Sequence, residues 1–191
     1  EALAQTLPVL AADDAMLAAR LLDIPSAQEL ASAISKDYDP VLVKEQRDGL
    51  YKQVADKLKG QWAELYNSLP MQSYEDSAKA RGIRALRNVI LDMALTANVD
   101  DAADWAQQQY DNASCMTERF GALKAMVNHQ LAGADKYLAD FYERFQANDL
   151  VIDLWFSVQA AADDVTPDMV KSLLTHKDFD WNTPNRVRSV V

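Results

Sequence analysis

Apolar residues recur at intervals of three and four along most of the chain, and this spacing places them on one face of an α-helix. One stripe consists of Leu50, Tyr51, Val54, Leu58, Trp62 and Leu65, and a second of Ile83, Leu86, Ile90, Met93 and Ala97. The segment 149–162 is apolar on nearly every side, which predicts a helix buried between neighbours. No stretch shows the strict alternation of apolar and polar residues that is typical of a β-strand.

Helix-start signals divide these stripes into separate helices. Ser26 and Glu29 fit a capping box, in which each residue satisfies the other's exposed backbone donor. A cap residue before a proline is a second signal, and it occurs at Asp39-Pro40, Thr166-Pro167 and Thr183-Pro184. Further caps are expected at Asp100 and Asn148. The predicted helices are 12–22, 26–35, 40–67 with a break near Gly60, 74–98, 100–112, 116–131, 134–146, 149–162, 167–175 and one that starts at residue 184.

Composition supports an all-helical chain. Thirty Ala and 22 Leu, against five Gly and six Pro, make it rich in helix formers and poor in helix breakers. Because short loops join the predicted helices, consecutive helices are expected to be antiparallel neighbours. A compact bundle and an α-solenoid both fit this pattern. The short links and the number of helices, about ten, favour the solenoid, so we predict an all-α, HEAT-like superhelical stack of antiparallel helix pairs.

Charge and hydropathy exclude several classes of partner. The chain has 19 Lys and Arg against 29 Asp and Glu, a formal net charge of −10. No nucleic-acid partner is expected, because binding to phosphates needs clustered Lys and Arg. No membrane partner is expected, because the most apolar stretch, 150–162, is shorter than the roughly 20 residues of a spanning helix. The single cysteine, Cys115, leaves no partner for an internal disulfide.

Few residues fit catalytic or metal-binding patterns. Neither His129 nor His176 belongs to the His-Glu-x-x-His arrangement that places two zinc ligands on one helical face. We interpret both as structural or helix-capping residues, since cations favour helix C-termini. Cys115 is a nucleophile only if a histidine approaches it, and its expected role is that of a small, partly buried residue. The sequence therefore predicts no catalytic residue and no metal ligand.

Three carboxylate pairs and one aromatic cluster receive structural interpretations. The pairs are Asp13-Asp14, Asp100-Asp101 and Asp163-Asp164. Each pair lies at a predicted helix boundary, where negative charge interacts favourably with a helix N-terminus. The cluster consists of Phe141, Tyr142, Phe145, Trp155 and Phe156. These rings are expected to pack as the core between two adjacent helices.

One basic feature is the best candidate for a binding role. Arg186 and Arg188 follow Pro184 at a helix start, where positive charge gains nothing from the helix dipole. A guanidinium group pairs well with a carboxylate. We predict that Arg186 and Arg188 line a substrate cavity, and the alternative is that both are ordinary solvated arginines.

Five segments, taken in order along the chain, carry a family resemblance. Residues 137–160 read YLADFYERFQANDLVIDLWFSVQA, and residues 176–189 read HKDFDWNTPNRVRS. The upstream segments are 23–30, 84–91 and 115–123. Together they resemble the C-terminal helical domain of bacterial aminopeptidase N, a zinc-dependent alanyl aminopeptidase. The sequence departs from that family at Cys115, Leu154, Lys177 and Thr183, where relatives usually carry Asn, Lys, Pro and Asn.

The resemblance implies a supporting role for this chain. In the family, the zinc ligands and the Gly-x-Met-Glu-Asn segment that binds the substrate amino terminus belong to a separate catalytic domain, and neither motif occurs here. The chain would be a non-catalytic cap that packs over the catalytic domain of the same polypeptide and encloses the cavity through which peptides reach the zinc. It would hold no cofactor itself, the parent enzyme would hold Zn, and the location would be the bacterial cytoplasm. Arg186 and Arg188 match the arginines of the family's Asn-Arg-x-Arg segment.

Two other functions stay open. The first is a free-standing α-solenoid that binds a partner protein, which needs complete terminal repeats. The second is a helical enzyme that uses Cys115 or a carboxylate pair. The sequence has no initiator Met, no visible signal peptide and an unfinished last segment. We expect residues 1–191 to be a single helical domain excised from a longer protein, without the catalytic domain upstream of it and several helices downstream.

Overall fold

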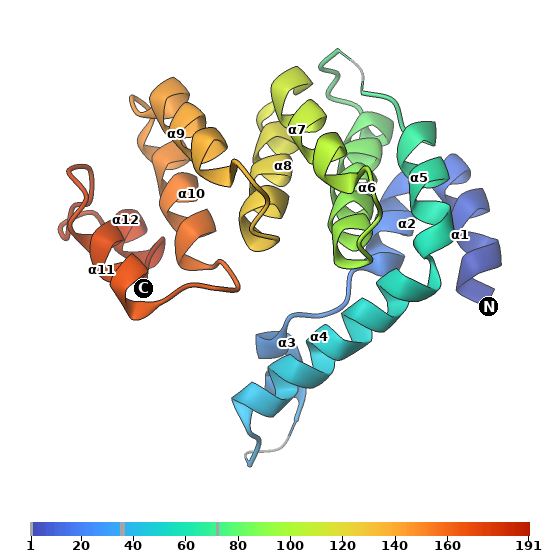
Figure 1. Ribbon diagram of the computed structural model, residues 1–191, viewed down its shortest axis with the longest axis horizontal. Coiled ribbons are helices and arrows are strands. Elements are labelled where there is room, and N and C mark those ends of the chain that lie inside the picture. Colours follow the sequence, from blue (N-terminus) through green and yellow to red (C-terminus); the bar gives the residue numbers. More distant parts are fainter. Residues whose placement is uncertain (1, 35–36, 72) are drawn as a thin grey trace. The chain divides into compact units, whose positions relative to one another are not determined.

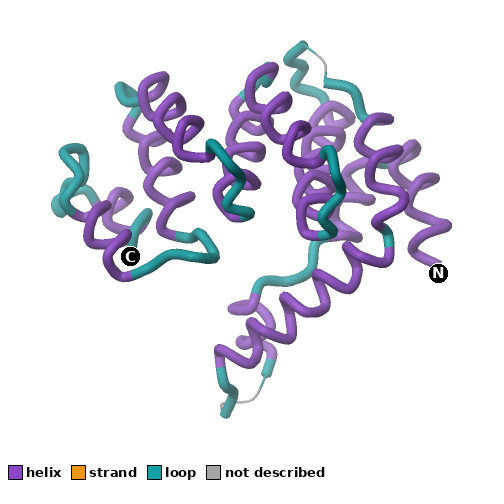
Figure 2. The backbone as a smooth tube through the Cα atoms, viewed as in Figure 1, coloured by secondary structure: helices purple, strands orange, loops and turns teal. Residues whose placement is uncertain are grey.

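A computed structural model describes residues 2–34, 37–71 and 73–191, and every regular element in these ranges is a helix (Figure 1; Figure 2). The helices are α1 (Ala2–Asp13), α2 (Ala15–Leu22), α3 (Ala27–Ala33), α4 (Pro40–Lys57), α5 (Lys59–Ser68), α6 (Ala78–Thr96), α7 (Ala102–Asn112), α8 (Met116–Asn128), α9 (Ala134–Phe145), α10 (Asp149–Ala160), α11 (Pro167–Leu174) and α12 (Pro184–Arg188). The predicted all-α fold of short-linked helices is confirmed, with twelve helices in the described ranges instead of about ten.

The chain forms two compact units, Glu1–Ala122 and Leu123–Val191, and α8 contributes residues to both. In the N-terminal unit α6 is the central helix and packs against α2, α4, α5 and α7. Its stripe of apolar residues is fully buried at Leu86, Ile90 and Met93. In the C-terminal unit α9 packs against α10, which also contacts α11 and α12. The single domain expected over 1–191 stays a prediction.

Most of the predicted helix starts are confirmed. At α3 the backbone N–H of Glu29 donates to Ser26 Oγ at 3.2 Å, and the N–H of Ser26 donates to Glu29 Oε2 at 2.8 Å. The helix predicted over 26–35 ends at Ala33, and residue 35 lies outside the described residues. Three other predicted caps also accept hydrogen bonds from the first turns of their helices, and they are Asp39, Asn148 and Thr166.

One predicted cap is wrong, and another lies at its predicted position without a capping bond. The residue before α7 is Asp101 instead of Asp100, and its side chain makes no capping hydrogen bond. Thr183 precedes α12 as expected, but its hydroxyl donates to Asp180 Oδ2 at 2.8 Å instead of accepting from the helix. This bond orients the hydroxyl toward the turn before α12.

Two helices end earlier than predicted, because a residue shortly after the end of each helix adopts a left-handed conformation. The helices predicted to residues 98 and 131 are α6 and α8, which end at 96 and 128. Asn98 and Gln130 have φ values of 52° and 51°. Beyond α8, the N–H of Leu131 donates to the Met126 carbonyl at 3.0 Å. This five-residue bond belongs to the Schellman motif, which terminates a helix.

The long helix predicted over 40–67 is broken as expected. The break falls at Leu58, two residues before Gly60, and separates α4 from α5. The indole Nε1 of Trp62 donates to the Ala55 carbonyl at 2.8 Å. A buried side chain thus satisfies one of the carbonyls that lose their helical partners where α4 ends.

The main element that the sequence analysis missed is α1. It contains Pro8, which has no N–H to donate to the Ala4 carbonyl four residues earlier. Gln61 of α5 supplies the missing donor, because its Nε2 donates to that carbonyl at 3.0 Å. The helix predicted from residue 12 begins instead at Ala15, behind its cap Asp14.

The contact between α2 and α6 depends on a glycine. A Cβ atom at Gly82 would lie 2.8 Å from the backbone nitrogen of Met16, closer than real Cβ atoms come to a backbone atom. Without a side chain at this position, the two helix backbones touch directly. The neighbouring buried side chains of α2, Ala18 and Leu22, complete this contact.

Two buried arginines of α6 hold the segment that precedes it. Arg87 donates to the carbonyls of Leu69 and Tyr66, and its guanidinium lies 4.1 Å from the centre of the Tyr66 ring. Arg84 donates to the Glu75 carbonyl at 2.9 Å. Because these donors end on backbone carbonyls of the same unit, both arginines are structural.

Candidate functional site

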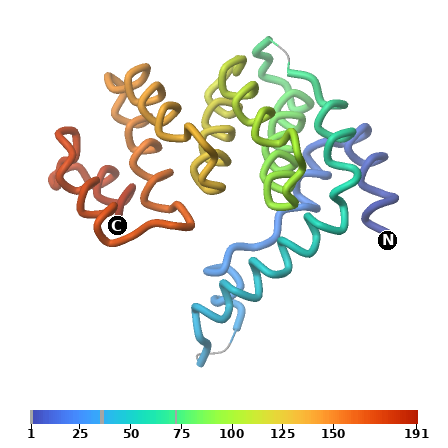
Figure 3. Tube along the Cα trace, in the orientation of Figure 1, coloured from blue at the N-terminus to red at the C-terminus, as the bar shows by residue number. Residues whose placement is uncertain are grey.

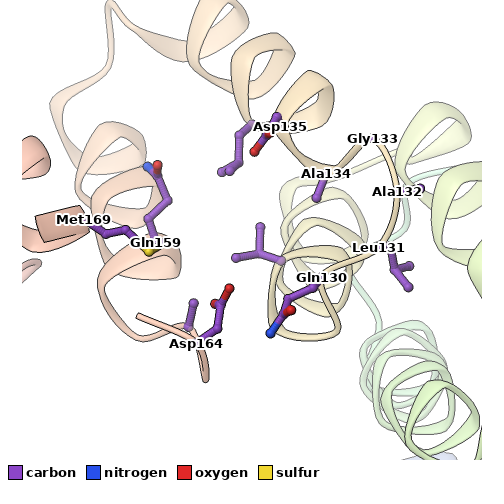
Figure 4. A pocket seen from close by; sticks show the side chains of 12 residues that line it. Gln130, Leu131, Ala132, Gly133, Ala134, Asp135, Gln159, Asp164 and Met169 are labelled. Carbon is purple, nitrogen blue, oxygen red and sulfur yellow. The ribbon is translucent and has the colours of Figure 1, made fainter. Parts of the chain in front are cut away.

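A cavity of about 430 Å³ lies within the C-terminal unit (Figure 4). Its walls come from the end of α8, the turn that follows, the start of α9, the end of α10 and the start of α11. Apolar side chains, among them Leu138, share the wall with two amides and two carboxylates. These four polar residues are Gln130, Gln159, Asp135 and Asp164.

The turn that forms one wall of this cavity requires two positive φ angles. Gln130 ends α8 with φ of 51°, and Gly133 precedes α9 with φ of 88°. Gly133 offers no side chain to cap α9, and Asp135 instead places a negative charge in the first turn of that helix. The sequence analysis missed the cavity because it extended the helix to residue 131, although Gly133 is a residue that favours such a turn.

The cavity offers several polar groups for binding. Its two carboxylates and two amides offer hydrogen-bond acceptors, and the amide nitrogen of Gln159 already donates to the Trp155 carbonyl at 2.8 Å. Among the described residues that line it there is no His, Cys, Ser or Lys. The ionisable groups of this wall are the carboxylates of Asp135 and Asp164.

Arg186, the first predicted cavity residue, is buried within the C-terminal unit. Its Nε donates to Asp153 Oδ1 at 2.5 Å, and its Nη2 lies 3.7 Å from Asp149 Oδ1. Its Nη1 donates to the Asp178 carbonyl, and the guanidinium lies 5.0 Å from the centre of the Phe156 ring. These contacts fasten α12 and the turn before it to α10.

Arg188, the second predicted cavity residue, lies two positions further along α12 and is exposed. A step of two residues turns an α-helix by about 200°, so the two arginines lie on opposite sides of α12. Arg186 thus fixes the helix, and Arg188 is the guanidinium that this helix presents to the solvent.

His176 lies among aromatic rings at the end of α11. Its ring centre is 5.1 Å from that of Trp155 and 5.3 Å from that of Tyr142. Its Nδ1 accepts a hydrogen bond from the N–H of Asp178 at 3.2 Å. Burial lowers the pKa of His176, and this effect exceeds the opposite influence of the Asp178 carboxylate. These contacts agree with the structural role predicted for His176, which stays a prediction.

The aromatic cluster is the core that the sequence predicted. Phe141 and Phe156 are fully buried between α9 and α10. Phe141 contacts Phe145, and Trp155 contacts both Tyr142 and Phe156, at centre-to-centre distances of 4.9 to 5.1 Å. The indole of Trp155 donates to a backbone carbonyl, so its polar atom is satisfied within the core.

Other candidates from the sequence lie at helix ends. Cys115 is half-buried immediately before α8, and Asp14 caps α2. His129 follows the last residue of α8. The described ranges contain no group of three or more His, Cys, Asp or Glu placed to hold a metal ion. Within the same ranges, no helix has the length and apolarity needed to cross a membrane.

Comparison with protein families adds what the geometry leaves open. The family described as "Domain of unknown function (DUF3458_C) ARM repeats" matches residues 1–191. The chain belongs to this family. ARM repeats are stacked helical units, which agrees with the helix pairs of this DUF3458_C chain.

Curated relatives of the DUF3458_C chain are aminopeptidases. It is 31% identical over 179 residues to aminopeptidase N of Haemophilus influenzae and 32% identical over 183 residues to aminopeptidase N of Escherichia coli. Each match covers 93% of this chain and 20% of the relative. The DUF3458_C chain thus spans about one fifth of the length of these relatives, and its resemblance to a helical domain of aminopeptidase N is confirmed.

A solved structure has the same fold. The crystal structure of Legionella pneumophila aminopeptidase A in complex with aspartic acid matches with a TM-score of 0.79 and 27% identity. The match covers 93% of the DUF3458_C chain and 22% of that protein. The fold of the present chain is therefore one that occurs as part of a larger aminopeptidase.

Proposed function

We propose that this DUF3458_C chain is the non-catalytic helical domain of an aminopeptidase that removes N-terminal residues from peptides. It packs over the catalytic domain of the same polypeptide and encloses the substrate cavity. The observation that carries the proposal is the similarity over 93% of the chain to aminopeptidases of which it spans only 20%. Since these relatives are bacterial, a bacterial cytoplasmic location is part of the proposal.

The zinc ion that the resemblance implies does not fit the residues of this chain. A zinc site in proteins takes three or four Cys, His or carboxylate ligands close together. The described ranges contain no such group. The proposal therefore assigns zinc and the hydrolytic step to the remainder of the parent enzyme, and assigns shape and charge to this chain.

In this proposal the two arginines of α12 have different tasks. Arg188 faces the substrate cavity of the parent enzyme and binds the carboxylate of a peptide substrate. An exposed guanidinium is open to a bidentate pair with a carboxylate. Arg186 is a positioning residue, since its bonds to Asp153 and to the Asp178 carbonyl hold α12 in place.

The test compares two substrates in the complete natural polypeptide that contains residues 1–191. Trialanine ends in a carboxylate, whereas alanyl-p-nitroanilide has none. Arg188→Ala is expected to raise the KM for trialanine roughly tenfold, the effect of losing about 1.4 kcal/mol of charge-assisted hydrogen bonding. Hydrolysis of alanyl-p-nitroanilide should change little. The matched control is Arg20→Ala, which removes an exposed arginine of α2 that pairs with Asp23 at 3.6 Å.

Each outcome decides one part of the proposal. If the complete polypeptide releases alanine from neither substrate, the aminopeptidase assignment is wrong and the free-standing interaction module becomes the function to test. If Arg188→Ala behaves like Arg20→Ala in an active enzyme, only the cavity role of Arg188 is wrong. The isolated chain 1–191 is expected to hydrolyse neither substrate.

A further inference from the structure

The hairpin of α3 and α4 differs from the rest of the N-terminal unit. We define the α3–α4 arm as residues 27–34 and 37–54. Figure 3 shows it extending away from the helices that pack around α6. No described residue between Ala31 and Ala55 is buried. Instead, large apolar side chains of the arm are 44 to 64% exposed, and they are Ile34, Tyr38, Val41, Leu42 and Leu50.

Most interactions within the arm are local, and bonds of Arg47 to the Pro25 carbonyl and of Tyr51 to Asp92 hold its base. Asp39 caps α4, and two exposed ion pairs, Lys44–Asp48 and Lys52–Asp56, connect successive turns. Exposed ion pairs contribute little to stability, because water competes for both charges. The apolar side chains of the arm therefore lack the burial that normally offsets the entropy of ordering a helix. A surface outside this chain that covers these side chains would supply the missing burial.

The outer face of α4 is shaped for close contact. At 100° per residue, Leu42 and Gly49 lie on the side of α4 opposite Tyr51, whose hydroxyl bonds to Asp92 of α6. Beyond its chain neighbours and the backbone of its own helix, a Cβ atom at Gly49 would meet nothing within 4 Å. Glycine weakens a helix interior, and nothing in this chain requires it here. A second backbone that approaches α4 at Gly49 would require it.

Charge indicates the kind of surface that covers the arm. The arm contains three basic and five acidic side chains, so it carries a formal charge of −2 in a chain of net charge −10. An apolar, weakly acidic face suits a protein surface and not the phosphates of a nucleic acid or a membrane, whose negative charge repels it. A second copy is disfavoured, because two chains of charge −10 repel each other.

We propose that the outer face of the α3–α4 arm docks on the catalytic domain of the same polypeptide. This inference rests on the proposed function, and it names the surface that the cap uses. The chain matches only 20% of the length of its relatives, which leaves most of a polypeptide to supply the partner surface. A tethered partner also has a high effective concentration, so a modest apolar face is sufficient for stable docking.

The test is cysteine labelling of the complete natural polypeptide in a Cys115→Ala background. Leu42→Cys places a thiol on the outer face, and Lys44→Cys places one on a different side of the same helix. The two side chains have similar exposure in this chain, 52% for Leu42 as a whole residue and 56% for the side chain of Lys44. Maleimide labelling, located by peptide mass spectrometry, is expected to be at least about tenfold slower at position 42 than at position 44, because a docked apolar face excludes water.

Three results would overturn the docking proposal. Equal labelling rates at the two positions would show that the outer face is open. Protection that appears only at high protein concentration, together with a dimer in sedimentation, would identify a second copy as the occupant. Protection in a polypeptide without aminopeptidase activity would refute the proposed function together with the docking. Equal rates in an active enzyme would refute the docking alone.

Discussion

Two leucines of the N-terminal unit lie in opposite environments, although each belongs to a regular helix. Leu86 of α6 is fully buried, and Leu42 of α4 is half exposed. The helix α6 has neighbours on several sides, whereas the first half of α4 contacts chiefly α3. Helical spacing of apolar residues thus predicts the helix in both places. It does not predict whether the apolar face packs against another helix of the same chain.

The largest expected contrast is between alanine substitutions at these two leucines. Leu86→Ala should lower the free energy of unfolding by about 2–5 kcal/mol, because it removes buried methyl groups and leaves a cavity. Leu42→Ala should change it by less than about 0.5 kcal/mol, the usual range for exposed sites. Urea unfolding of the chain, followed by circular dichroism, measures both. A loss at Leu42 as large as at Leu86 would mean that the arm is packed within the chain.

Alanine substitutions at two glycines should change the stability of the chain in opposite directions. Gly82→Ala forces a Cβ against the Met16 backbone and should destabilise the chain by about 1–3 kcal/mol. Gly49→Ala meets nothing and should stabilise the chain by about 1 kcal/mol, the difference in helix propensity. Thermal unfolding of the two variants beside the wild type provides the comparison. Stabilisation by Gly82→Ala would contradict the close contact of α2 with α6.

Tyr51 joins the base of the arm to the core. Burial and the neighbouring Asp92 carboxylate raise the pKa of the Tyr51 hydroxyl, which therefore stays protonated and donates to Asp92. Tyr51→Phe should cost about 1.5 kcal/mol of unfolding free energy, the usual value for a bond to a charged acceptor. Tyr38→Phe, on the exposed part of the arm, is the control and should be close to neutral. Equal losses of unfolding free energy in the two variants would mean that the bond to Asp92 does not contribute to stability.

The smallest effect is expected at His176, in the aromatic core of the C-terminal unit. Its pKa is lower in the folded chain than the ordinary 6.5, so the unfolded chain binds the proton more readily. The stabilising contribution is complete above pH 6.5 and is lost as the pH falls toward the folded pKa. His176→Gln should therefore reduce the loss of stability between about pH 7 and pH 5.5. An identical pH dependence in both proteins would refute this assignment.

Local chemistry explains why much of the fold was predictable. The helix expected over 134–146 is Ala134–Phe145, and the one expected over 149–162 is Asp149–Ala160. Their starts are signalled by Asn148 and by the Gly133 turn, within a few residues of each helix. Such signals act over one helical turn, and a sequence displays them directly.

The features that escaped prediction depend on distant residues. Helix α1 forms in spite of Pro8, because a glutamine of α5 replaces the missing donor. In the candidate site, the sequence singled out Arg186 by its position at a helix start. Its burial depends on Asp149 and Asp153, which precede it by more than thirty residues. The sequence of α12 and its helix dipole do not reveal that those carboxylates lie beside Arg186.

The bond between Gln61 and the Ala4 carbonyl also affects the order of events during synthesis. The ribosome makes α1 before α5, and the donor that completes α1 is encoded 57 residues after the carbonyl that it bonds. Until α5 has left the exit tunnel, only water can bond to the carbonyl that Pro8 leaves without its helical donor. Helix α1 therefore reaches its final form only after α5 has been made.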